Sequence, residues 1–180
     1  MQNEIKKRAV FLFALTLLAS LLPVSGAAPD LLKAKEKTLV LIFVSSECPI
    51  SNKMAPEIER LHRKFSTNDV ALTVVYPNAS DSEKTIAAHQ REYHLSAPFT
   101  RDPKHELVKA AGVTVTPEAV VFNAAREIVY RGRINDQYLA LGKGRPAPTQ
   151  HDLEEAIEAT VAGKKPKESR TEAIGCYIQD

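Results

Sequence analysis

The chain has few of the residues that mark several common protein classes. Its 180 residues include two cysteines, seven glycines and no tryptophan. Two cysteines exclude both a disulfide-dense small scaffold and a zinc site built from cysteines alone. The apolar fraction of 44% and the charged fraction of 26% exclude collagenous and disordered compositions, and the length corresponds to one domain.

The chain also lacks an excess of charge of one sign. Its formal net charge is +2, and residues 1–26 supply all of it, so that beyond Gly26 the chain has 21 basic and 21 acidic side chains. Binding to nucleic acid requires clustered positive charge against the phosphates. The balance therefore predicts no nucleic-acid surface.

The N-terminal residues have the pattern of an export signal. The basic residues 6–8 precede an apolar stretch over residues 9–22, and Pro23 and the small residues 25–28 follow. This order predicts a signal peptide over residues 1–26 and an extracytoplasmic mature protein, periplasmic or secreted. The apolar stretch of about 14 residues is shorter than the roughly 20 that a membrane span needs, so we expect no stable span after cleavage. An uncleaved N-terminal anchor is the alternative.

Apolar periodicity beyond the signal predicts an alternation of strands and helices. Strands are predicted over residues 38–44, 70–76, 98–100, 118–123 and 127–131. Helices are predicted over residues 50–65, 82–94, 103–111 and 153–161, the third capped by Asp102 and ended by Gly112. Strands joined through helices are parallel neighbours, whereas the last two strands form an antiparallel hairpin.

This order predicts one α/β domain over residues 27–163, with a central mixed sheet flanked by helices. Residues 143–148 (KGRPAP) are predicted to be a loop. Residues 164–180 form a C-terminal tail that carries Cys176, and its polar part, residues 164–171, is predicted to be an extended linker.

Cys48 is the candidate reactive residue. It lies where the first strand ends and a helix begins, with Pro49 at the expected first helical position. Free backbone N–H groups and the positive end of the helix dipole meet there, and both favour a thiolate over a thiol. Ser51 is placed to donate a hydrogen bond to the sulfur from the same turn. Position alone also permits an inert, buried cysteine at this point.

Residues 43–51 (FVSSECPIS), followed by Pro56-Glu57, resemble the active-site segment of extracytoplasmic redoxin-domain proteins of the thioredoxin-like superfamily, relatives of alkyl-hydroperoxide reductases and thiol-specific antioxidant proteins. The resemblance places Cys48 on the nucleophilic cysteine. Ser51 stands where the usual C-x-x-C motif has its second cysteine. A thioredoxin-like fold is implied, in agreement with the order of elements.

The resemblance continues further along the chain. Residues 112–117 (GVTVTP) look like the cis-proline loop of the superfamily, with Pro117 on the cis-proline and Thr116 before it. Residues 130–138 and Gly175-Cys176 extend the match. A cis bond at Pro117 would offer the backbone of Thr116 to the extended chain of a partner.

The implied activity is thiol–disulfide exchange with a protein partner, without a cofactor or a metal. Cys48 would be the nucleophile, and Cys176 is the remaining internal cysteine that could resolve a mixed disulfide. One alternative is a non-catalytic binding module stapled by a permanent Cys48–Cys176 disulfide. Another is a copper-binding chaperone of thioredoxin fold that holds Cu(I) with both cysteines and a histidine. Peroxide reduction is a minor alternative: Ser45 keeps a hydroxyl at the threonine position of the peroxiredoxin pattern, but Leu41 replaces its proline.

Other polar residues give weaker signals. The five histidines show no pair at the usual metal-ligand spacing, and His89 and His94, five residues apart, are interpreted as surface residues of one helix. Arg131 and Arg133 follow the predicted hairpin and are candidates to face the thiolate. Exposed positions on a strand are the alternative for both arginines.

Overall fold

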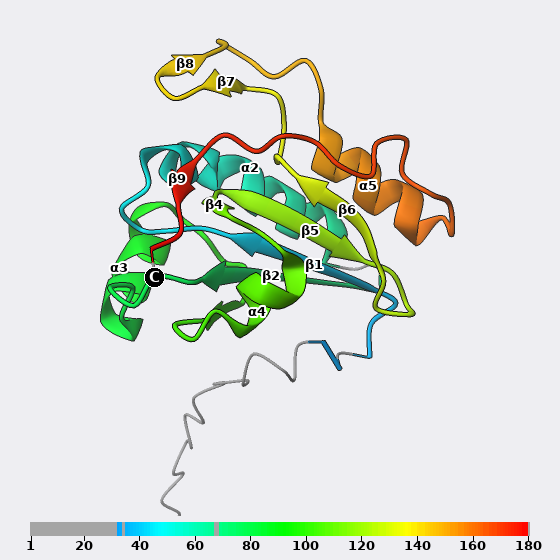
Figure 1. The fold of residues 1–180 in the computed structure, drawn as a ribbon, viewed down its shortest axis with the longest axis horizontal. Helices are drawn as coiled ribbons and strands as arrows, with labels where there is room; N and C mark the ends of the chain where they lie inside the picture. The colour runs from blue at the N-terminus through cyan, green and yellow to red at the C-terminus, as the bar shows by residue number, and fades with distance from the viewer. Residues whose placement is uncertain (1–31, 34, 67–68, 180) are drawn as a thin grey trace, which may run out of the picture.

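The computed structural model describes residues 32–33, 35–66 and 69–179 (Figure 1). The predicted signal peptide, residues 1–26, lies outside these residues. The strands are β1 (Thr38–Phe43), β2 (Val70–Tyr76), β3 (Phe99–Arg101), β4 (Val115–Thr116), β5 (Glu118–Phe122), β6 (Ile128–Gly132), β7 (Tyr138–Ala140), β8 (Lys143–Gly144) and β9 (Cys176–Tyr177). The helices are α2 (Pro49–Phe65), α3 (Glu83–Glu92), α4 (Glu106–Ala111) and α5 (Asp152–Val161). Within the described ranges, no helix has both the length and the apolarity that crossing a membrane requires.

The central sheet has the mixed topology that the sequence predicts. Its strand order is β3-β2-β1-β5-β6. Strand β2 pairs in parallel with both β1 and β3, because α2 and α3 connect these strands. Strand β5 is antiparallel to β1 and forms the predicted hairpin with β6. The carboxyl ends of β1 and β2 therefore lie side by side at one edge of the sheet.

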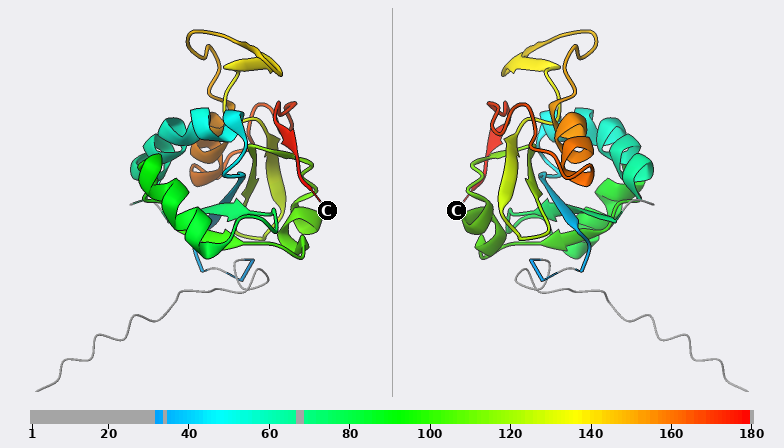
Figure 2. Two further views of the ribbon diagram at one scale, coloured as in Figure 1. Left: turned by 90° about the vertical axis from the view of Figure 1, so that its left-hand side faces the viewer. Right: turned by 90° about the vertical axis from the view of Figure 1, so that its right-hand side faces the viewer.

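Apolar layers cover both faces of this sheet. Val40 and Ile42 of β1 contribute to a core with the apolar stripes of α2 and α5 and with Ile86 of α3. Leu39 and Leu41, which alternate with them along the strand, pack on the other face with α4. Figure 2 shows α2, α3 and α5 on one side of the sheet and α4 on the other. A strand buried on both faces explains the continuous apolar run at residues 38–44.

The structure corrects two of the predicted elements. Helix α4 begins at Glu106 rather than Pro103, after His105 with a left-handed φ of 56°. The Asp102 carboxylate still caps it, because it accepts hydrogen bonds from the backbone N–H groups of Glu106 and Val108. The predicted loop at residues 143–148 contains β8, which pairs with β7 in a hairpin that projects from the domain (Figure 1).

The C-terminal tail is not a free linker. The backbone N–H of Arg131 in β6 donates to the oxygen of Ser169 at 3.0 Å, and the N–H of Thr171 donates to the oxygen of Arg131 at 3.1 Å. We call residues 169–171 the tail clamp. Beyond the clamp the tail crosses to β4, where β9 pairs with it (Figure 1).

Candidate active site

Cys48 occupies the position that the sequence predicts, at the start of α2. It is the N-cap residue, and Pro49 is at the first helical position. The Cys48 N–H donates to the oxygen of Ser45 at 3.1 Å, and the Cys48 oxygen accepts from the N–H of Asn52 at 3.0 Å. The first turn of α2 has no acidic side chain. The free N–H groups at this helix end therefore favour a negative charge on the sulfur, with no carboxylate in that turn to oppose it.

The tail brings Cys176 directly onto Cys48. Strand β9 runs antiparallel to β4, with Cys176 opposite Thr116. The two sulfur atoms lie 2.8 Å apart, and both residues are free thiols. Cys48 is only 2% exposed. The Cys48 side chain is thus buried, with the Cys176 thiol of β9 against its sulfur.

The two thiols have opposite pKa shifts. Burial raises the pKa of Cys48, but hydrogen bonds from the Cys176 thiol, from the backbone and side chain of Ser51 and from the Cys176 backbone together lower it below its ordinary value of 9.0. Burial, the hydrogen bond to Cys48 and the negative charge of Cys48 raise the pKa of Cys176 to about 11. Cys48 therefore ionises first, and Cys176 keeps the shared proton.

The other predicted site residues also meet at this point. The Thr116–Pro117 peptide bond is cis, as the sequence predicts. The Thr116 oxygen lies 3.0 Å from the Cys48 sulfur and accepts a hydrogen bond from it while Cys48 is a thiol. Ser51 is buried, and its hydroxyl oxygen accepts from the N–H of Ser45 at 3.4 Å. Its hydroxyl hydrogen is then left for the sulfur of Cys48.

Sequence reasoning missed a layer of polar residues that holds the loop before Cys48. The Asn78 side chain donates to the Ser45 hydroxyl at 3.0 Å, and its oxygen accepts from the N–H of Gln179 at 3.4 Å. Asn78 thus connects the active-site loop to the tail. The available signal was that Asn78 and Ser45 both follow the carboxyl ends of parallel strands, which meet at one edge of a sheet.

A second polar group lies under the same loop. Buried Asp81 accepts hydrogen bonds from the backbone and hydroxyl of Ser46, while its other oxygen has no partner among the described residues.

His89 bonds the Asn52 side-chain oxygen at 2.9 Å and the Tyr76 hydroxyl at 2.8 Å. Since the Asn52 oxygen only accepts, His89 carries its proton on Nε2. Burial lowers the pKa of His89 against the opposing effects of Asp81 and Glu92.

The interpretation of His89 as a surface residue is therefore wrong, although His94 is exposed. The sequence could not show that the polar side of α3 faces other polar side chains. The arginines also differ from expectation. Arg133 donates to Asp152 at 2.8 Å, and Arg131 donates to the oxygen of Ala111 at 3.2 Å, so neither points at the thiolate.

A candidate metal-ligand group lies elsewhere in the described part of the chain. Ligand atoms of Glu57, His151 and Glu154 lie within 4.8 Å of one another, without an ion. Arg60 and Lys64 already pair with Glu154. No histidine or carboxylate in the described residues joins the two cysteines in such a group.

The chain is similar in sequence and in fold to several known proteins. The thiol-disulfide oxidoreductase ResA of Halalkalibacterium halodurans is 27% identical over 104 residues, which is 58% of this chain and 58% of ResA. This chain thus spans well under two thirds of the length of that relative. The structure is similar to a hypothetical protein of Sinorhizobium meliloti 1021, with a TM-score of 0.72, 22% identity and coverage of 83% and 82% of the two chains.

A further solved structure supplies the name of the fold. The thioredoxin domain of the thiol-disulfide oxidoreductase BVU-2223 from Bacteroides vulgatus has a TM-score of 0.53 and 13% identity, covering 74% of this chain and 84% of that one. Together with the sheet order, this likeness establishes a thioredoxin-like fold. The sequence pattern of the Redoxin family matches residues 15–138, which is most of the chain. The chain therefore belongs to the Redoxin family.

Proposed function

We propose that this protein is an exported thiol–disulfide oxidoreductase in which Cys48 is the nucleophile and Cys176 the resolving thiol. Membership of the Redoxin family and the similarity to ResA support the class of reaction. The observation that carries the assignment of roles is the contact of the two sulfurs at 2.8 Å, with the pKa of Cys48 lowered and that of Cys176 raised.

The first step uses the thiolate of Cys48. It attacks one sulfur of a disulfide in a partner protein, forms a mixed disulfide with that sulfur and releases the other as a thiolate. The negative charge moves from Cys48 to the leaving sulfur, which takes up a proton from solvent. The Cys176 thiol is not consumed in this step, because it enters the step protonated from the resting state, in which its pKa is raised.

The second step follows from the loss of charge on Cys48. Two of the three causes that raise the pKa of Cys176 are its hydrogen bond to Cys48 and the charge of Cys48, and the mixed disulfide removes both. The Cys176 proton is then released to solvent, and its thiolate attacks the Cys48 sulfur. A Cys48–Cys176 disulfide forms, and the partner leaves as a dithiol that has gained two electrons. An external dithiol, itself oxidised to a disulfide, restores the starting state.

A redox titration with glutathione buffers tests this proposal. The fraction of Cys48–Cys176 disulfide is measured by alkylation and mass, with Cys48→Ser and Cys176→Ser as controls that cannot form it. We expect a reduction potential above about −300 mV, because structural disulfides lie below that value. A lower potential would support the stapled binding module instead. Tight uptake of Cu(I) that either variant abolishes would support the copper chaperone.

Export requires a separate measurement. The basic, apolar and small-residue segments within residues 1–28 support it. We expect the protein recovered from a cell fraction outside the cytoplasm to begin near Ala27. Protein that keeps residues 1–26 in the cytoplasm would contradict the export part of the proposal and leave the chemistry of Cys48 unaffected.

A further inference from the structure

The segment that covers Cys48 binds as an extended peptide. Val115 lies opposite Tyr177 and Thr116 opposite Cys176, in antiparallel pairing. The N–H of Ile178 donates to the oxygen of Thr114 at 3.1 Å, which extends the pairing by one bond. Cys176 therefore occupies the place next to Cys48 that a cysteine of a docked partner would have to take.

The residue before Cys176 is limited to glycine by close packing. A Cβ atom on Gly175 would overlap the backbone carbonyl group of Thr116 and lie 3.1 Å from the nitrogen of Pro117. These are backbone atoms of the loop that binds the segment, so they cannot turn aside as a long side chain could. Any segment that binds in this way therefore needs glycine immediately before its cysteine.

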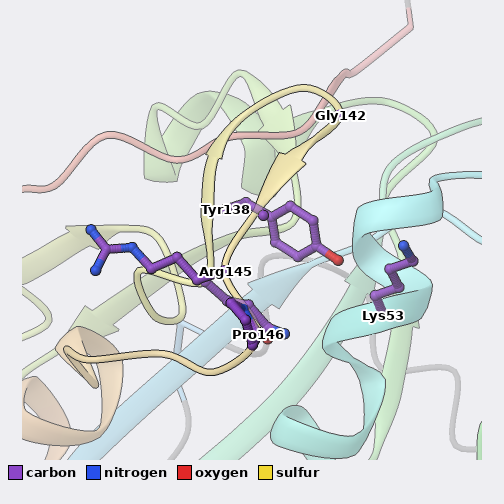
Figure 3. Close-up of a pocket in the computed structure, with 7 residues that line it drawn as sticks. Lys53, Tyr138, Gly142, Arg145 and Pro146 are labelled. Carbon is purple, nitrogen blue, oxygen red and sulfur yellow. The ribbon is translucent and has the colours of Figure 1, made fainter.

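The residue two positions before Cys176, Ile174, is half-buried and lines a small pocket. Its apolar neighbours there are Ile50 and Met54 of α2, Pro117 and Tyr138, while Arg133 and Asn135 supply polar lining, and the open space is only about 10 Å³. Figure 3 shows Tyr138 directed from the β7–β8 hairpin toward α2, across a larger cavity of about 500 Å³. The hairpin thus supplies one wall of the pocket for Ile174.

The residues after the cysteine differ in what they contact. The Tyr177 side chain is 80% exposed, so its position places no demand on a bound segment. Ile178 packs against the apolar cluster that includes Leu107 and Phe43. The segment therefore has an apolar residue at its first and last positions, glycine before the cysteine and a free position after it.

We propose that residues 174–178 are a built-in copy of the partner segment that this site recognises. Resting on the proposed function, the inference names the substrate class: protein disulfides in which one cysteine lies in an extended segment of the form apolar–glycine–cysteine–any residue–apolar. Such a segment pairs with Val115 and Thr116, and its cysteine sulfur receives the attack of Cys48. The second cysteine of its disulfide leaves as a thiolate.

The tail and the partner segment then compete for the same backbone edge of β4. Tethering gives the tail an effective concentration on the order of millimolar, which a free segment has to overcome. Loosening the tail should therefore speed the reaction with a partner segment. Gly175→Val is the direct variant, because its side chain cannot fit against Thr116.

The test uses two full-length variants in which Cys48 is the sole thiol, Cys176→Ser and Gly175→Val/Cys176→Ser. The probe is a peptide copying residues 173–179, with its cysteine as a mixed disulfide with thionitrobenzoate. Attack by the Cys48 thiolate joins the peptide to Cys48 and releases coloured thionitrobenzoate. Control peptides carry alanine for the glycine, aspartate for the first isoleucine, or alanine for the tyrosine. Circular dichroism confirms that both variants fold.

We expect the double variant to react with the copied peptide roughly tenfold to a hundredfold faster than with the peptides that carry alanine for glycine or aspartate for isoleucine. The alanine does not fit against Thr116, and the aspartate loses the apolar burial. The peptide with alanine for tyrosine should react within about twofold of the copy, as expected of an exposed position. Cys176→Ser alone, which keeps Gly175, should react with the copied peptide more slowly than the double variant does.

Equal rates with all four peptides would overturn the inference. Dithiobis(nitrobenzoate), a small disulfide that needs no docking, separates this failure from failure of the proposed function. If it reacts readily with Cys48 while the peptides are not distinguished, the nucleophile stands and the copied segment does not. If neither the small disulfide nor any peptide reacts, both proposals fail.

Discussion

The tail clamp should set how strongly Cys176 is held near Cys48. Thr171 forms the centre of the clamp, since its hydroxyl contacts the Tyr130 hydroxyl at 2.7 Å and accepts from the N–H of Arg133 at 3.1 Å. A Cβ atom on Gly132 would overlap the backbone of Thr171. Gly132→Ala should therefore release the clamp while leaving both cysteines in the chain.

The size of the effect follows from the length of the tether. With the clamp closed, Cys176 lies five positions after Thr171, whereas release extends the free chain back to Gly163, 13 positions before Cys176. Effective concentration falls roughly as the −3/2 power of tether length, so the equilibrium constant for closing the Cys48–Cys176 disulfide should fall about fourfold. For a two-electron couple this raises the reduction potential by about 18 mV.

The assay is the ratio of disulfide to dithiol in glutathione buffers, for the wild type and Gly132→Ala side by side. Thr171→Val, which removes the hydroxyl but keeps the shape, should shift the ratio in the same direction. Thr171→Ser keeps the hydroxyl and is the matched control. An unchanged or more reducing potential in Gly132→Ala would refute the reasoning that the clamp shortens the tether.

Three further predictions concern ionisation. Cys176→Ala removes the thiol that donates to Cys48, so the pKa of Cys48 should rise and the pH profile of its alkylation should move to higher pH; Cys176→Ser, which keeps a donor, should move it less. Ser51→Ala should shift the same profile in the same direction. An unshifted profile would show that Ser51 does not stabilise the Cys48 thiolate. Asp136→Asn should lower the free energy of unfolding by about 1.5–3 kcal/mol, because the carboxylate accepts bonds from the backbone N–H groups of Thr149 and Gln150. The hydroxyl of Thr149, together with these backbone N–H groups, holds the pKa of Asp136 well below its ordinary 3.8. The stability it contributes is present above that value and lost as pH falls, so wild type and variant should converge in acid urea titrations.

Local patterns predicted most of the fold. The apolar run of β1, the stripe of α2 and the turn residues between them are short-range features, and Pro49 marks the start of the helix that carries Cys48. The strand–helix junction therefore follows from residues that are neighbours in the chain. The prediction of a cis bond before Pro117 rested on the resemblance to redoxin proteins, because most X–Pro bonds are trans.

The features that the sequence did not predict depend on contacts between residues that are distant in the chain. Strand β9 has two residues, and its pairing with β4 is set by Gly175 fitting against Thr116, which no periodicity records. His89 is buried because Asn52 and Tyr76 supply its hydrogen bonds from two other elements. A histidine on a polar helix face gives the same sequence pattern whether it faces water or such partners.

In the proposed reaction, the pairing of β4 with β9 would also set the order in which the two reactants bind. A disulfide partner and a reducing dithiol protein would both have to reach Cys48 over Thr116, at the edge that β9 occupies. The two cannot be bound at once, so each must leave before the other arrives. Steady-state turnover should therefore follow double-displacement kinetics, with parallel lines in double-reciprocal plots and inhibition by an excess of either reactant.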